Sequence, residues 1–215
     1  MSGNMAGSGR HPSEETLLGY AAGGLDEAYR VVVATHLAGC SACRDAVLLA
    51  ERVGGGVLDG LDAAPMAAGA LDRALARLDE PAPPTPRLTP PPPGLPATLA
   101  GYQLGRWRNI GKGFGFATLM PPEGKRAGLH LFRIEPGMRI AGHGHHGLEL
   151  TMVLQGAFRD HSGVFAAGDV AENAEDHEHA PMAVGDVSCI SLIALSGRLQ
   201  FHHWMARLLQ PLIGF

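Results

Sequence analysis

The sequence has few cysteines, no excess of basic residues and no long apolar run. Its 215 residues include only three cysteines, too few for the disulfide framework that stabilises small secreted proteins. Lys and Arg number 17 against 21 Asp and Glu, which argues against direct nucleic-acid binding, because such proteins present a basic face. The N-terminus, MSGNMAGSGR, lacks the apolar core of a signal peptide, and no apolar run is long enough to span a bilayer. We therefore expect a cytoplasmic protein without membrane association.

The chain divides at a proline-rich stretch, EPAPPTPRLTPPPPGLP, which covers residues 80–96. Such sequence cannot continue a helix and favours extended polyproline II, so we expect a semi-rigid spacer. The pattern before the stretch is helical, and the pattern after it is typical of strands. We therefore predict a two-domain α + β protein, with a small helical domain at residues 1–85, a linker at 86–97 and a β-domain at 98–215.

Four short helices are predicted before the linker. The first, within SEETLLGYAAG, follows Ser13, whose hydroxyl can accept a hydrogen bond from a free backbone N–H group. The second, EAYRVVVATHLA, follows Asp26 as its N-cap and is expected to end at Gly39 as a C′ residue. The third covers CRDAVLLAERV, and the fourth covers residues 67–78, where leucines recur at helical spacing.

Short apolar segments dominate the sequence after the linker. LHLFRI, LELTMVL and VSCISLIAL are rich in β-branched or bulky residues and are separated by Gly, Pro and Asp. This pattern predicts an antiparallel β-sandwich or barrel. Cys189, within the third segment, is expected to be a buried core residue.

The stretch THLAGCSAC places a histidine and two cysteines within eight positions. His36 falls in the last turn of the second predicted helix, and Cys40 and Cys43 fall on the turn into the third. One imidazole and two thiolates suit a tetrahedral zinc site that needs a fourth ligand. His11 is the only other histidine before the linker, although its position alone is more typical of a solvated histidine. A redox CxxC pair is the alternative, but the βαβ context of a thioredoxin is missing.

His11, His36, Cys40 and Cys43 together resemble the zinc-binding anti-sigma domain of bacterial regulators of extracytoplasmic-function sigma factors. In that family a histidine before the first helix joins an HxxxCxxC motif and completes the zinc site. The resemblance therefore implies that His11 is the fourth ligand. A bundle of this size buries little surface, so zinc would tie its helix ends together.

A second set of metal ligands lies in GMRIAGHGHHGLELTMVLQG, residues 137–156. His143 and His145 are two positions apart, which places both on one face of a strand, and Glu149 has the same parity. His146 has the opposite parity and is expected to point away. The string matches the first motif of the cupin family, G-x5-H-x-H-x3-E-x6-G, at every position, and its side chains suit zinc or another divalent metal.

The second cupin motif, G-x5-P-x-G-x2-H, begins at Gly168 and reaches His179 as a further metal ligand. Ala174 and Asp176 replace the proline and the second glycine of the motif. His177 shares the strand face of His179 and is the competing candidate. The spacing from the glycine favours His179.

Over nearly the whole chain the sequence resembles the ChrR-type zinc-dependent anti-sigma factors, which join an anti-sigma domain to a cupin-like domain. The resemblance implies a regulator, not an enzyme, that sequesters an extracytoplasmic-function sigma factor. It also implies that the cupin-like domain is needed for the response to singlet oxygen, an oxidative stress. A leucine stripe in the fourth predicted helix could pack either on the partner or on the protein's own core; it consists of Leu71, Leu75 and Leu78.

Two other functions are compatible with the same residues. Many cupins with three histidines and a glutamate are metal-dependent dioxygenases, although the cupin stretch shows no obvious accessory acid–base residues. Alternatively, Cys40 and Cys43 could form a disulfide and expel zinc in a thiol–disulfide redox regulator. The dioxygenase hypothesis leaves the helical half of the sequence unexplained.

Overall fold

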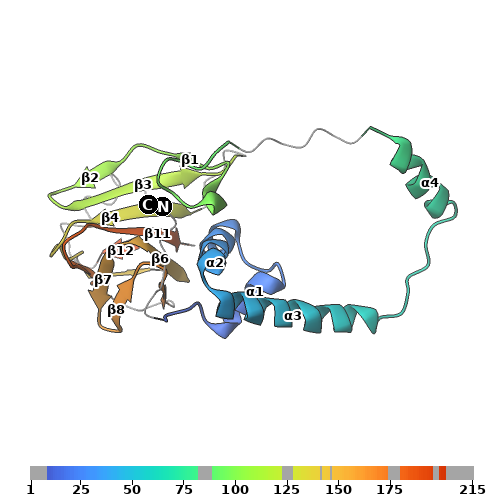
Figure 1. The fold of residues 1–215 in the computed structure, drawn as a ribbon, viewed down its shortest axis with the longest axis horizontal. Helices are drawn as coiled ribbons and strands as arrows, with labels where there is room; N and C mark the ends of the chain where they lie inside the picture. Colours follow the sequence, from blue (N-terminus) through green and yellow to red (C-terminus); the bar gives the residue numbers. More distant parts are fainter. Residues whose placement is uncertain are drawn as a thin grey trace.

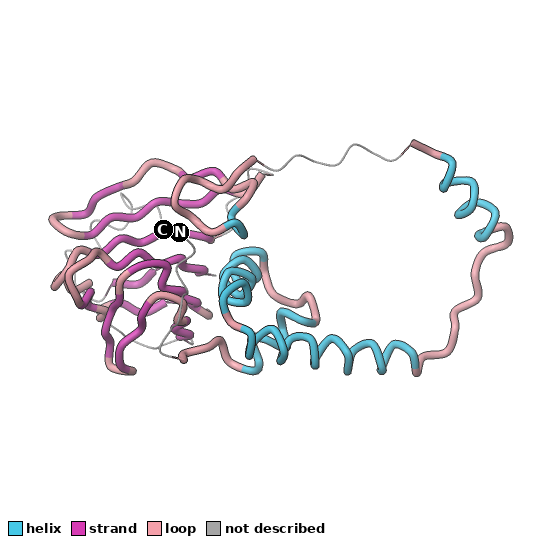
Figure 2. Tube along the Cα trace, in the orientation of Figure 1, coloured by secondary structure: helices cyan, strands magenta, loops and turns pink. Residues whose placement is uncertain are grey.

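The computed structural model describes residues 9–81, 89–122, 128–140, 142–145, 147–173, 180–195 and 199–201, with the backbone alone for 143–145 and 199–201. Helices come first in the chain and strands follow (Figures 1 and 2). The helices are α1 Glu14–Ala21, α2 Glu27–Gly39, α3 Ser41–Asp59 and α4 Ala70–Ala76, with 3-10 turns at Arg77–Asp79 and Ala97–Leu99. We call residues 9–81 the helical region and the described residues from 89 onward the strand region.

The start of α1 and the junction of α2 with α3 show how the local sequence sets the helix ends. Ser13 caps α1, and its Oγ accepts a hydrogen bond from the Thr16 N–H at 3.1 Å, as predicted. Asp26 is the N-cap of α2, although its side chain makes no capping hydrogen bond. The prediction for Gly39 was wrong, because it is the last helical residue and the following Cys40 is extended, with φ −111°. Cys40 ends α2 and caps α3 at once, which turns the chain within one residue.

The third and fourth helices differ in length from the prediction. α3 continues through three consecutive glycines to Asp59, although the sequence had indicated an end near Val53. α4 is shorter than predicted and is followed directly by the 3-10 turn. Figure 1 shows α3 projecting away from the strand region, with α4 at the far end of the helical region. α4 has no buried residue.

The strand region forms three antiparallel sheets. Its strands are β1 Gln103–Leu104, β2 Arg108–Ile110, β3 Phe114–Met120, β4 Leu129–Ile134, β5 His143–His145, β6 Glu149–Gln155, β7 Ala157–Asp160, β8 Gly163–Ala166, β9 Val170–Asn173, β10 Met182–Val184, β11 Cys189–Leu195 and β12 Leu199–Phe201. The largest sheet has the order β1-β3-β4-β11-β6-β9, with β2 paired to β3. The other two are β10-β7-β8 and β12-β5. β4, β6 and β11 confirm the three predicted apolar strands.

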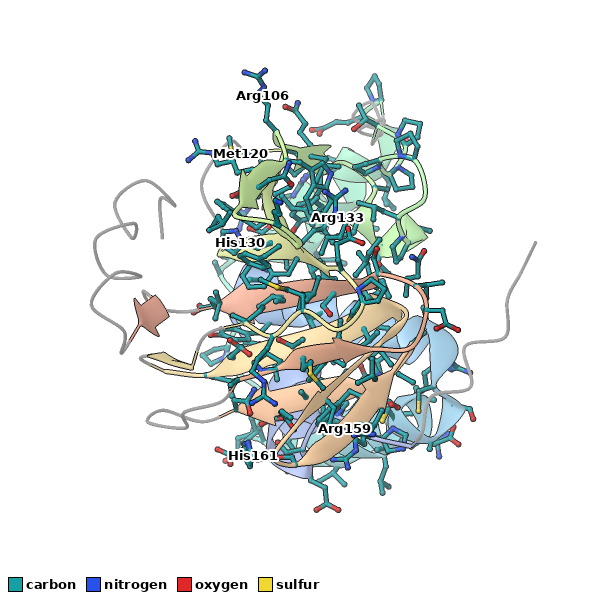
Figure 3. All side chains as sticks on the ribbon, turned by 90° about the vertical axis from the view of Figure 1, so that its left-hand side faces the viewer. Arg106, Met120, His130, Arg133, Arg159 and His161 are labelled. Atoms are coloured by element: carbon teal, nitrogen blue, oxygen red, sulfur yellow. The ribbon has the colours of Figure 1, made fainter. Side chains whose placement is uncertain are left out.

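The sheets have the antiparallel pairing of a cupin-like fold, but they remain separate within the described residues. Figure 3 views the strand region from the side opposite the helices. His130 and Arg133 of β4 lie on the large sheet, and Arg159 and His161 mark the β7–β8 hairpin below it. The sheets enclose an apolar core, which contains Phe158 of β7. The closed barrel thus stays a prediction.

The helical and strand regions share one apolar core. Val32 and Val33 of α2 are fully buried in the same cluster as Leu150 and Met152 of β6. Two tyrosines add polar contacts between the regions: the Tyr29 hydroxyl donates to the Leu148 carbonyl, and the Tyr102 hydroxyl donates to Glu27 Oε1. α2 is therefore the helix that attaches the helical region to the sheet. Cys189 is fully buried, as predicted.

Two features of the helices and the linker bear on earlier predictions. Within the described ranges, no single helix is long and apolar enough to cross a membrane. α2 and α3 reach the necessary length and apolar content only when taken together, and the chain bends by 120° between them. Residues 82–88, which include the start of the predicted linker at 86–97, lie outside the described residues. The domain boundaries at 85/86 and 97/98 stay a prediction.

Candidate metal centres

Four predicted ligands meet where α1, α2 and α3 begin or end. The possible ligand atoms of His11, His36, Cys40 and Cys43 all lie within 4.8 Å of one another. His11 Nδ1 is 3.3 Å from His36 Nε2, 3.5 Å from Cys40 Sγ and 3.4 Å from Cys43 Sγ, and His36 Nε2 is 3.3 Å from Cys43 Sγ. We call these four residues the His2Cys2 cluster.

The spacing of the His2Cys2 cluster fits a single tetrahedral ion. At the bond lengths that zinc takes to histidine and cysteine, a tetrahedral ion separates two nitrogens by about 3.3 Å and a nitrogen from a sulfur by about 3.6 Å. The one nitrogen–nitrogen and three nitrogen–sulfur distances given above agree with these values within a few tenths of an ångström. The four side chains could therefore hold one metal ion.

The second ring nitrogen of His36 is bound to the strand region. Nδ1 lies 2.9 Å from the carbonyl oxygen of Gly168. A carbonyl can only accept, so Nδ1 carries the proton and the Nε2 lone pair points into the cluster. A hydrogen bond of this kind is the usual way in which proteins orient a ligating histidine.

Burial shifts the pKa values of two cluster residues in the direction of their neutral forms. Desolvation lowers the pKa of His36, against the opposing effect of its hydrogen bond to Gly168. Burial, followed by the hydrogen bond and charge of Cys40, raises the pKa of the Cys43 thiol to about 12. A metal ion would stabilise the thiolate in place of the proton. Cys40 and Cys43 are free thiols in this structure.

One side of the His2Cys2 cluster opens into a cavity of about 190 Å³ between the two regions. Its lining includes Arg10, His11 and Cys40 from the helical region and Met152 and Asp169 from the strand region. Solvent and small molecules can therefore approach the cluster from this side. No sequence pattern had pointed to Asp169 beside the cluster, because it lies more than a hundred residues from Cys43.

Of the predicted cupin ligands, Glu149 is the one whose side chain the structure describes. It is buried, and its Oε1 accepts hydrogen bonds from Thr151 Oγ1 at 3.1 Å and Asn173 Nδ2 at 3.3 Å. It borders a cavity of about 20 Å³, which is room for roughly one water molecule or ion. The sequence had not identified Thr151 or Asn173 as neighbours of Glu149.

The predicted histidines of the second site are described in part. His143 and His145 are the ends of β5, as their alternation had suggested, but only their backbone is described. Gly147, with φ +81°, separates β5 from β6, so strand parity does not extend from the histidines to Glu149. His177 and His179 lie outside the described residues.

Large apolar residues are exposed on α3, on α4 and on the 3-10 turn that follows α4. Those more than half exposed include Leu49, Val53, Val57, Leu71, Leu75 and Leu78. The three leucines of the predicted stripe therefore do not pack on the protein's own core. Large apolar side chains exposed along projecting helices are candidates for contact with a partner. We call these six residues the exposed apolar surface.

Comparisons with known proteins agree on one relationship. The family described as the ChrR cupin-like domain matches residues 100–197. The chain is 40% identical over 207 residues to the anti-sigma-E factor ChrR of Cereibacter sphaeroides, covering 94% of this chain and 96% of that protein. It also resembles a chain in the crystal structure of Rhodobacter sphaeroides SigE in complex with the anti-sigma ChrR. That match has a TM-score of 0.72 and 37% identity, over 87% of this chain and 98% of the other.

Proposed function

The chain belongs to the ChrR family of anti-sigma factors, and on that premise we propose that it sequesters an extracytoplasmic-function sigma factor. The observation that carries the proposal is the exposed apolar surface of α3 and α4. Burying these leucines and valines against a partner would remove a large apolar area from water, at about 25 cal/mol per Å². The role is regulatory and not enzymatic.

The division of labour that we propose follows the two regions. The helical domain, residues 1–85, would bind sigma; the linker, residues 86–97, would join it to the cupin-like domain at 98–215. An acidic helical region supports this assignment, because residues 1–80 carry eleven Asp or Glu and six Lys or Arg. Acidic charge would favour a basic partner surface. A sigma factor acts on RNA polymerase, so we also propose a cytoplasmic location.

Zinc is the metal that we propose for the His2Cys2 cluster. Two thiolates and two imidazoles at tetrahedral spacing are a common structural zinc set. When bound, zinc supplies a fixed cross-link between the ligands and no redox chemistry. His11 would join the segment before α1 to the α2–α3 turn, and the cross-link would hold the start of the sigma-binding helices together.

We further propose that the cupin-like domain senses oxidative stress, with singlet oxygen as the signal. A second metal, zinc or another divalent ion, would be held by His143, His145, Glu149 and His179, with His177 as the alternative to His179. Support comes from the cupin motif and from the burial of Glu149 at a cavity of ion size. A closed β-barrel would surround this ion.

Sequestration is tested with the purified full chain and sigma factors of the extracytoplasmic-function class from the same genome. The expected result is a stable complex with one of them and loss of its transcription from a cognate promoter in vitro. The double variant Leu71→Asp/Leu75→Asp should weaken the complex by at least about tenfold, since it removes central apolar contacts. Val187→Asp, on an equally exposed valine outside the helical region, is the control. Equal inhibition by the double variant and the control would refute the proposed surface.

A further inference from the structure

The N-terminal segment, residues 10–13, lies along the outer edge of β9. β9 is the last strand of the large sheet. The Val170 N–H donates to the Arg10 carbonyl at 3.1 Å, and the Arg10 N–H donates to Asp169 Oδ1 at 3.3 Å. These bonds satisfy backbone groups that an edge strand would otherwise present to solvent. The segment that carries His11 is thus attached to the strand region before it reaches the helices.

The side chain of Arg10 provides a second attachment. Its Nη2 donates to the Ser162 carbonyl at 2.7 Å, in the β7–β8 hairpin next to His161 (Figure 3). Its guanidinium carbon lies 4.5 Å from the centroid of the Phe165 ring, a cation–π contact. Arg10 therefore fixes the chain on the N-terminal side of His11.

Glu172 of β9 fixes the chain on the other side of His11. Its Oε2 accepts from the Ser13 N–H at 2.8 Å, and its Oε1 accepts from Ser13 Oγ and Thr16 Oγ1, both at 2.8 Å. Hydrogen bonds to a carboxylate are stronger than those between neutral groups. His11 is therefore held between two anchored positions, Arg10 and Ser13, both bound to the strand region.

His36, on α2, is also oriented by the segment that leads into β9. The carbonyl that receives its Nδ1 proton belongs to Gly168, one residue before Asp169 and two before β9. Both histidines of the His2Cys2 cluster are thus set by residues 168–172, whereas Cys40 and Cys43 are set by the α2–α3 turn. The cluster draws its geometry from both regions.

We propose that residues 168–172 are the positioning element of the His2Cys2 cluster, so that the strand region controls how tightly the N-terminal metal is held. This inference rests on the metal site in the proposed function. Glu172 acts through Ser13 on His11, and Gly168 acts directly on His36. Loss of such outer contacts typically weakens metal binding by about ten- to a hundredfold.

The test uses the full chain with the variants Glu172→Ala and Glu172→Gln. A third variant, Arg10→Ala, removes the anchor on the other side of His11. Glu135→Gln is the matched control, because Glu135 also accepts from a serine, Ser188 Oγ at 2.6 Å, but in the strand region alone. Zinc transfer to a chromogenic chelator and the visible spectrum of the Co²⁺-loaded chain are measured. Thermal unfolding followed by circular dichroism reports the fold.

The Glu172 and Arg10 variants should release zinc about ten times faster or more, with a weaker tetrahedral Co²⁺ spectrum and an unchanged β-sheet signal. The control should match the wild-type chain. The inference would be overturned, with the metal site intact, if Glu172→Ala and Arg10→Ala kept the wild-type zinc release rate and Co²⁺ spectrum. It would also be overturned if Glu135→Gln accelerated zinc release as much as they do. If the wild-type spectrum lacks thiolate ligation and equals that of Cys43→Ser, the metal site itself fails, and the inference with it.

Discussion

α2 and α3 are both rich in apolar residues, but they use them in opposite ways. α2 buries seven of its thirteen residues, whereas α3 buries two of nineteen, Cys43 and Val47. The buried face of α2 packs on the same core as the large sheet, whereas the leucines of α3 and its valines after Val47 remain in contact with solvent. One helix therefore attaches the helical region to the rest of the molecule, and the other presents a surface for a partner.

The largest effect is expected where the two helices meet. Cys43→Ser removes a thiolate from the His2Cys2 cluster, so the chain should lose its N-terminal zinc and its inhibition of sigma, because metal-binding energy there is folding energy. α2 should stay protected in hydrogen exchange, since it also packs on the sheet, whereas residues 10–21 should lose protection. Metal analysis and exchange mass spectrometry check this. Cys189→Ala, in the core, should retain the zinc; retained zinc and inhibition in Cys43→Ser would show that the cluster is misinterpreted.

A matched pair of valines separates the roles of α2 and α3 directly. Val33→Ala in α2 should lower the free energy of unfolding by about 2 kcal/mol, because the side chain is fully buried. The Val53 side chain in α3 is 61% exposed, so Val53→Ala should change the free energy of unfolding by less than about 0.5 kcal/mol. For sigma binding we expect the reverse, with a larger loss of affinity in Val53→Ala than in Val33→Ala. Urea unfolding and binding titrations measure both, and an equal loss of stability at the two positions would contradict the comparison.

The same contrast explains how far the sequence alone could go. Ser13 as a cap, the strands β4, β6 and β11 and the grouping of His36, Cys40 and Cys43 follow from local spacing. The full length of α3 could not be predicted from the sequence. Gly54, Gly55 and Gly56 resemble a helix end, but all three are helical in the structure. Periodicity also left open whether the α4 leucines were buried, since that depends on what else packs there.

The contacts around the metal ligands were beyond sequence reasoning for a different reason. Glu172 meets Ser13, and Gly168 meets His36, across separations of more than a hundred residues. Such pairings depend on how α2 packs against the sheet, which no local pattern encodes. His11 could be proposed as a ligand only through family resemblance, because by itself it is an isolated histidine near the N-terminus.

A smaller effect is expected at the contact between Tyr102 and Glu27, where α2 meets the segment before β1. Tyr102→Phe removes the hydroxyl that donates to Glu27 and should lower the free energy of unfolding by about 1 kcal/mol. Burial, with the hydrogen bond to Glu27, raises the pKa of Tyr102 above its ordinary value. The neutral phenol is therefore favoured in the folded chain, so this stability is complete below pH of about 10 and declines above it.

Urea unfolding of the wild-type chain and of Tyr102→Phe at pH 8 and at pH 11 measures this dependence. The difference in stability between the two proteins should shrink at the higher pH. Tyr20→Phe, at the end of α1 and away from this contact, is the control for loss of a hydroxyl. A difference that grows with pH would contradict the direction of the pKa shift.

The smallest effect on the resting protein is expected at Glu149, which lies on β6 and is not part of the exposed apolar surface. Glu149→Gln keeps the side-chain shape and can still bond to Thr151 and Asn173, so sigma affinity should stay within about twofold of wild type, as for distant independent sites. If the cupin-like domain is the sensor, release of sigma under photosensitised singlet oxygen should nevertheless be lost. Asn173, the last residue of β9, donates to Glu149, and its neighbour Glu172 accepts from Ser13. β9 therefore offers a direct route from that site to the N-terminal metal. A sigma-dependent reporter, with Glu135→Gln as control, reads both properties; normal release by Glu149→Gln would rule out sensing through this carboxylate.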